Sequence, residues 1–184
     1  MSDFNVSTRY ANALLAIAIE TNQFEVISND VDYVLDVFAN VKALKVAIYS
    51  PVIKLEKKIQ ILEEVFKAKI SSKTFEFLTF LLNKRRDTLL ISILKRYCTL
   101  RDNKKGVANV KVKVAFDISE EQKNKLKDKL EEITKKQVTL SIQKDELIIG
   151  GFIARHEDTV YDASIKHSLE LLKKQFLEGE KVLN

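Results

Sequence analysis

The spacing of apolar residues changes once along the chain, near residue 105, and this change predicts two structural units of different class. Before it, apolar residues recur every three or four positions, as they do in amphipathic helices. After it they fall on every second position, at Ala108, Val110, Val112, Val114 and Phe116. Such alternation predicts a strand with one buried face. We therefore expect an α+β protein, with a helical unit over residues 1–105 and a small α/β unit over residues 106–184.

The first unit contains several amphipathic segments with short connections, which is the pattern of an antiparallel helical bundle. The periodic segments run over residues 24–38, 55–66 and 90–100. Ser71 and Ser72 offer an N-cap for a further helix that extends through Lys84. Asn103 to Gly106 has the composition of a helix end, so the helical unit should stop there.

The second unit should begin with the strand that follows Gly106 and continue with a helix that opens at Ser119. Ser119 and Gln122 have the spacing of a capping box. We expect this helix to bury three apolar side chains: Leu126, Leu130 and Ile133. Alternation then predicts strands over residues 138–142 and 148–154. A final helix is expected from Ala163, with an inward stripe formed by Ile165, Leu169, Leu172 and Phe176.

Two predicted helices are apolar over far more of their circumference than one core requires. Apolar or small residues cover roughly 240° of a helical wheel between Tyr10 and Glu20, and roughly 220° between Phe75 and Lys84. A helix packed on a single core needs about 100°. Two interpretations follow. Both helices are buried on most sides within the bundle, or each also borders an exposed apolar groove that accepts an amphipathic partner helix.

The sequence offers little that could carry out chemistry. Gly150-Gly151 lacks the context of a phosphate-binding loop and is typical of a bulge in a strand. His156 and His167 stand apart from any cluster of metal ligands. His156 with its acidic neighbours is the candidate for a proton-transfer site of an enzyme, but a polar hairpin turn is the favoured interpretation of this segment. Cys98 is expected to be a small core residue and not a nucleophile. We expect no catalytic residue, no cofactor and no metal.

A nucleic-acid-binding module is the alternative function, because many lysines lie in the second unit. They are Lys111, Lys113, Lys123, Lys125, Lys127, Lys129, Lys135 and Lys136. Five acidic residues lie between Glu120 and Glu132, and no aromatic residue is interleaved there for base stacking. A solvated helix of mixed charge is therefore the favoured interpretation.

The composition predicts a soluble chain from a reducing compartment. The net charge of +5 permits an acidic partner without requiring one. The single cysteine cannot form an internal disulfide. The start of the chain has no features of a signal peptide. The most apolar stretch, residues 13–19, is far shorter than the roughly 20 residues that span a bilayer.

Several short motifs resemble the delta subunit family of bacterial F-type ATP synthase, which includes the mitochondrial oligomycin-sensitivity-conferring protein. Near the start these are Arg9-Tyr10-Ala11 and Ala13-Leu14. The most specific segment runs from Asp145 to Ser164, where Glu157 and Ala163 replace glycines that are common in the family. Its signature and turn residues are Asp145, Gly150, Gly151, Arg155, Asp158 and Asp162.

The resemblance implies an N-terminal antiparallel six-helix bundle followed by a small α/β C-terminal domain. It also implies a non-catalytic stator subunit that makes rotor torque available for ATP synthesis. The N-terminal domain would grip the N-terminal helix of an alpha subunit of the catalytic head, in a groove between its first and fifth helices. We expect that groove to be lined by Tyr10, Ala13, Leu14, Ile17, Phe77, Leu78 and Leu81.

The resemblance implies a second partner for the C-terminal domain, the end of the b-type subunits of the peripheral stalk. No nucleic acid, no direct membrane insertion and no homo-oligomer are expected. The protein would be held through the complex at the cytoplasmic face of the bacterial inner membrane, as a peripheral subunit.

Overall fold

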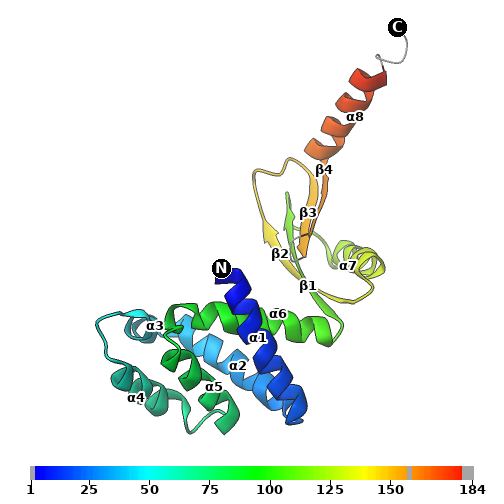
Figure 1. Ribbon diagram of the computed structural model, residues 1–184. Helices are drawn as coiled ribbons and strands as arrows, with labels where there is room; N and C mark the ends of the chain where they lie inside the picture. Colours follow the sequence, from blue (N-terminus) through cyan, green and yellow to red (C-terminus); the bar gives the residue numbers. More distant parts are fainter. Residues whose placement is uncertain (1–2, 157–158, 180–184) are drawn as a thin grey trace. The chain divides into compact units, whose positions relative to one another are not determined.

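The computed structural model describes residues 3–156 and 159–179, and it has the mixed α+β composition predicted from the sequence (Figure 1). Contacts between Cα atoms divide the chain into two compact units, residues 1–104 and 105–184. Each unit has a separate cluster of buried apolar side chains, so each is described by itself.

The first unit is helical throughout its described part. Its helices are α1 (Asp3–Glu20), α2 (Phe24–Asn40), α3 (Lys42–Tyr49), α4 (Leu55–Phe66), α5 (Ser72–Asn83) and α6 (Leu90–Lys104), with the 3-10 turn η1 (Asp87–Leu89) before α6. Helix α1 packs mainly on α6, and α2 packs on the same helix. The periodicity of the sequence did not separate α3 from α2, because only Val41 stands between them.

Buried polar groups join the helices of this unit. Ser71 caps α5 as predicted, its hydroxyl accepting a hydrogen bond from the Thr74 amide at 3.3 Å. Asp30 of α2 accepts bonds from the Ser71 amide at 2.9 Å and from the Thr74 hydroxyl at 2.7 Å. Lys58 of α4 is only 4% exposed and forms an ion pair with Asp87 of η1. These bonds satisfy charges that burial would otherwise penalise.

The second unit contains β1 (Val107–Val114), α7 (Glu120–Thr134), β2 (Gln137–Lys144), β3 (Gly151–His156), β4 (Thr159–Ser164) and α8 (Ile165–Gly179). The sheet order is β2-β1-β3-β4. Strands β1 and β2 are parallel, and the other two pairings are antiparallel. A parallel pair needs a long crossover, and α7 supplies it. The predicted capping box at Ser119 and Gln122 is present.

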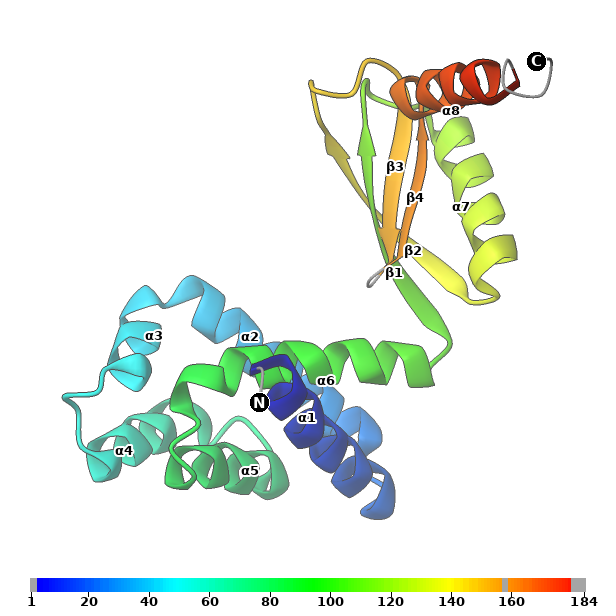
Figure 2. The same ribbon diagram turned by 45° about the horizontal axis from the view of Figure 1, so that its top comes forward.

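Helix α7 runs along one face of the sheet, and the core of the second unit lies between them (Figure 2). The core side chains are Ala108, Val110, Val112, Val114, Leu126, Leu130, Val138 and Ala154. The alternating burial of β1 confirms the period-two prediction for residues 108–114. The polar residues between them lie on the other face of the sheet.

Several local predictions for the second unit are wrong. Phe116 and Ile133 are exposed, because β1 ends at Val114 and Ile133 lies in the last turn of α7, where burial has stopped. The third strand begins at Gly151 and not at residue 148, since the left-handed Gly151 turns the chain into the sheet. The final helix starts at Ile165, because Ala163 and Ser164 pair with β3.

The predicted inward stripe of the last helix is also wrong. Its four members, Ile165, Leu169, Leu172 and Phe176, are all exposed, and Phe176 retains 73% of its surface. Helix α8 packs mainly against β4, the strand that leads into it. A periodic apolar stripe therefore exists on α8, but the described residues of this unit do not cover it.

Candidate partner-binding site

Helix α1 has one side in the core and an apolar side that reaches the surface. Leu14 has no exposed surface, whereas Tyr10 and Ile17 are half-buried and Ala13 is exposed. The exposed side also carries Ala16 and Ile19. Because a helix packed on one core exposes polar residues on its other side, this apolar surface is unusual for a solvated helix.

Helix α5 adds one exposed aromatic ring to that surface. Its buried face consists of Thr74, Phe77, Leu78, Leu81 and Leu82, which follow helical spacing. Phe80 lies outside this face and is 44% exposed. Its ring meets Tyr10 of α1 edge-on, with centroids 6.2 Å apart. The pair joins the two helices at the surface, and an edge-to-face arrangement of this kind is favourable.

The structure separates the seven residues predicted to line the groove into two groups. Leu14, Phe77, Leu78 and Leu81 belong to the hydrophobic core of the first unit. They cannot contact a partner while the bundle keeps this packing, so their placement on the groove surface is corrected. Tyr10, Ala13 and Ile17 remain accessible. We call these three residues with Phe80 the α1–α5 surface.

Sequence reasoning missed Phe80, although a signal for it was present. The buried positions of α5 follow a strict pattern of three- and four-residue steps, and residue 80 falls outside it. A large aromatic residue outside the buried stripe of a helix is a candidate for contact with a partner.

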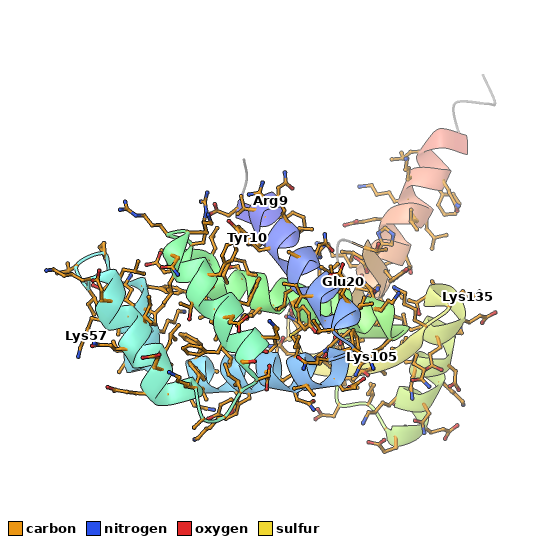
Figure 3. The ribbon with its side chains drawn as sticks, turned by 60° about the horizontal axis from the view of Figure 1, so that its bottom comes forward. Arg9, Tyr10, Glu20, Lys57, Lys105 and Lys135 are labelled. Carbon is orange, nitrogen blue, oxygen red and sulfur yellow. The ribbon has the colours of Figure 1, made fainter. Side chains whose placement is uncertain are left out.

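Two cations flank the α1–α5 surface. The Arg9 guanidinium lies 5.6 Å from the centroid of the Tyr10 ring, and the Lys84 ammonium lies 5.6 Å from that of Phe80. Figure 3 shows Arg9 and Tyr10 together on α1. A partner helix with an apolar face and acidic residues beside it would match this arrangement in shape and charge.

Cys98 lies in a partly buried polar cluster between α2 and α6. Its thiol is 3.6 Å from a carboxylate oxygen of Asp32, which also pairs with Arg101 at 2.6 Å. Burial is the main cause that raises the pKa of Cys98, to about 12. A thiol that stays protonated is a poor nucleophile, so the prediction of an unreactive cysteine agrees with its surroundings.

Two signature residues, Asp145 and Gly150, form hydrogen bonds in the loop that precedes β3. Asp145 accepts hydrogen bonds from Lys113 and from the Leu147 amide, and these bonds lower its pKa. The Gly150 carbonyl accepts from the Ile165 amide at 3.0 Å.

Other signature residues act in the adjoining strands. Asp162 accepts from the Ser164 amide at 2.9 Å. Gly151 pairs with Ser164, and a Cβ on Gly151 would lie 2.2 Å from the Ala163 carbonyl oxygen. Arg155 is exposed on β3, and Asp158 lies outside the described residues. The described signature residues other than Arg155 therefore shape turns and strand ends.

A second apolar region lies in the C-terminal unit. A cavity of about 680 Å³ opens between the end of β1 and α7, with Phe116, Ile118 and Phe152 among its lining residues. Helix α8 adds six large apolar side chains that are roughly half exposed or more: Ile165, Leu169, Leu171, Leu172, Phe176 and Leu177. Apolar surface of this extent usually binds a partner.

The residues considered for catalysis and for nucleic-acid binding make contacts within the protein. His156 Nδ1 lies 3.3 Å from the Asn109 carbonyl oxygen, and no described residue forms a nucleophile–base pair with it. Lys123, Lys125 and Lys127 pair with glutamates along α7.

The described residues contain no group of three His, Cys, Asp or Glu side chains able to hold a metal ion. No helix in the described ranges is long and apolar enough to cross a bilayer.

Comparisons with known proteins agree with the resemblance seen in the motifs. The family described as ATP synthase delta (OSCP) subunit matches residues 6–176. A protein named ATP synthase subunit delta from Chlorobaculum tepidum is 37% identical over 173 residues, which are 94% of this chain and 96% of that protein. Its namesake from Chlorobium limicola is 37% identical over 180 residues, covering 98% and 99%. The protein of the same name from Salinibacter ruber is 34% identical over 179 residues, covering 97% and 94%.

The fold also matches a solved structure. A chain in the cryo-EM structure of the Toxoplasma gondii mitochondrial ATP synthase hexamer superposes with a TM-score of 0.78 at 20% identity. The match covers 93% of this chain and 97% of that one. The comparisons give no support to the nucleic-acid-binding alternative. The chain belongs to the ATP synthase delta (OSCP) subunit family, whose members are non-catalytic stator subunits of the peripheral stalk of F-type ATP synthase.

Proposed function

We propose that this chain performs the stator role through two separate surfaces, one on each unit. The α1–α5 surface would hold the N-terminal helix of an alpha subunit of the catalytic head. The second unit would hold the end of the b-type stalk subunits. The observation that carries the first contact is the accessible apolar surface formed by Tyr10, Ala13, Ile17 and Phe80.

The chemistry of the α1–α5 surface suits a helix. Ala13 leaves space next to two larger side chains, so a partner side chain can settle between Tyr10 and Ile17. Each large apolar side chain that becomes fully covered contributes about 1.5–3 kcal/mol. Arg9 and Lys84 place cations beside the Tyr10 and Phe80 rings, and these cations favour acidic residues on the partner.

The core beneath this surface supplies rigidity. We infer that α1 to α6 act as one antiparallel six-helix bundle, because their buried side chains form a single apolar cluster. A rigid platform lowers the conformational entropy lost when the partner helix binds.

The proposed stalk contact rests on the uncovered apolar residues of the second unit. The stripe on α8 has the three- and four-residue spacing by which one helix packs against another. We place the protein at the cytoplasmic face of the bacterial inner membrane, where it would be held by its partners.

Calorimetric titration with a peptide of the alpha subunit's N-terminal helix tests the first contact. We expect one-to-one binding with a negative heat-capacity change, the sign of apolar burial. Ala13→Asp places a charge on the proposed surface and should weaken binding by about tenfold or more, since each tenfold corresponds to about 1.4 kcal/mol.

A matched control comes from the exposed alanine at the end of α2. Ala39→Asp introduces the same group on another helix and should leave the affinity unchanged. Equal affinities for Ala13→Asp and the unaltered chain, with both folded, would show that the alpha helix binds elsewhere.

A further inference from the structure

A small cavity lies between the first turns of α1 and the middle of α6. Its volume is about 350 Å³. It is lined by Asp3, Phe4, Ser7, Ser92, Lys95, Arg96 and Thr99. None of these residues belongs to the α1–α5 surface, and none is a signature residue of the family segment. Helices α1 and α6, which carry all of these residues, pack closely on each other.

Arg96 contributes a cation to this cavity. Its Nε atom is buried and has no hydrogen-bond partner among the described residues. Its guanidinium lies over the Phe4 ring, 4.9 Å from the centroid. Stacking on an aromatic ring orients a guanidinium but leaves its N–H groups free to donate in the plane. A buried donor on a charged group is costly when unpaired, and an acceptor that entered the cavity would remove this cost.

Ser7 provides a second unpaired group on the opposite wall. It is 4% exposed, and its hydroxyl has no hydrogen-bond partner within the described part of the chain. A serine inside a helix can bond the carbonyl oxygen one turn earlier, but no such bond forms here. The start of α1 adds a partial positive charge nearby, because its first amides are not used within the helix.

We infer that this cavity is a carboxylate-binding site in which Arg96 and Ser7 donate hydrogen bonds to the bound group. The planar guanidinium matches a carboxylate in shape and charge. Asp3 also lines the cavity and would repel a phosphate dianion more strongly than a single carboxylate. The volume leaves room for the short carbon chain that bears the carboxylate, with the Phe4 ring as its apolar wall.

Two sources could supply such a group, a small free carboxylate or a glutamate side chain of another protein. NMR of the uniformly ¹⁵N-labelled full chain tests both, because arginine Nε–H signals are resolved from backbone amides. We would titrate with sodium butyrate, and separately with glutamate blocked at both ends, at constant ionic strength. We expect saturable shifts of the Arg96 Nε–H signal and of the Ser7 amide.

Variants connect these shifts to the cavity. Arg96→Gln should lower the affinity about tenfold or more, since a hydrogen bond to a charged group is lost. Ser7→Ala should weaken binding without lowering the unfolding temperature, because the hydroxyl has no partner in the free protein. Asp3→Asn should strengthen binding by removing a like charge. Arg86→Gln, at an exposed arginine outside the cavity, is the control and should change nothing.

Each outcome supports or overturns the assignment. Saturation by butyrate identifies a small free carboxylate as a sufficient ligand, whereas saturation by the blocked glutamate alone identifies a protein side chain. Shifts that do not saturate, or that are equal at Arg86 and Arg96, would mean ionic screening and overturn the site. Binding of inorganic phosphate without binding of either carboxylate would overturn the carboxylate assignment.

Discussion

Ala13 and Leu14 are neighbours in the sequence, but the turn of α1 places them in opposite surroundings. Leu14 has no exposed surface and touches the bundle core, whereas Ala13 faces solvent. The same substitution at the two positions should therefore act on different properties. At Ala13 it should affect binding, and at Leu14 it should affect folding.

We expect Leu14→Asp to destabilise the first unit by at least about 3 kcal/mol, because an unpaired carboxylate replaces a buried apolar side chain. Urea unfolding followed by circular dichroism measures this change. Ala13→Asp is the matched control and should change the free energy of unfolding by no more than about 0.5 kcal/mol. A stable Leu14→Asp protein with impaired binding would restore Leu14 to the groove surface.

Two glycines with positive φ allow backbone strain to be separated from steric contact. Gly106 has φ +71° with no atom within 4 Å of an added Cβ, whereas Gly151 has φ +80° with a backbone oxygen at 2.2 Å. Gly106→Ala should cost about 1–2 kcal/mol from the left-handed conformation alone. Gly151→Ala should cost clearly more, as measured by thermal unfolding of the second unit. Equal costs would mean that β3 and β4 separate readily at this point.

At the scale of elements, α8 is a helix whose apolar stripe is not covered by any of the described residues. Its large apolar side chains remain exposed, and it packs mainly on β4. The opposite holds for α5, whose N-terminus is tied to α2 by the bonds that Asp30 accepts from Ser71 and Thr74. Removing an element that is bonded into a core lowers the stability of the unit, whereas removing an element outside the core changes that stability little.

Removing α8 after Ser168 should therefore change the stability of the second unit very little. We expect the unfolding temperature to fall by only a few degrees, since little buried apolar surface is lost. Binding of a dye specific for exposed apolar surface should decrease at the same time. A collapse of the second unit on truncation would mean that α8 belongs to its core.

For the whole molecule, the two hydrophobic cores are separate. The core of the first unit is formed by residues between Val6 and Tyr97, and that of the second by residues between Ala108 and Ala154. Among the described residues, no buried residue belongs to both clusters. Because each unit buries its own apolar surface, each should fold without the other.

Separate expression of residues 1–104 and 105–184 tests this independence. We expect each fragment to give a dispersed NMR spectrum that overlays on the corresponding signals of the full chain. Signals near residue 105 should differ, because the cut creates new termini there. A fragment that remains unfolded alone would show that its stability depends on the other unit.

Local sequence patterns determined the class of the protein and much of its element order. The change of apolar period near residue 105 predicted the helical and mixed parts, and Ser71 and Ser119 marked helix starts that the structure confirms. Such signals succeed because caps and periodicity depend on residues within a few positions of each other. The motifs between Asp145 and Ser164 were specific enough to indicate the family.

The tertiary structure alone decided which side of each broad apolar helix is buried. Leu14 and Leu81 lie in the core, while Phe80 and Ala13 reach the surface, although a helical wheel makes all four candidates for either place. It also decided that the stripe on α8 is exposed. Burial depends on whether another element lies against a given face, and that element can be distant in sequence. Periodicity describes the face, and only the fold supplies the neighbour.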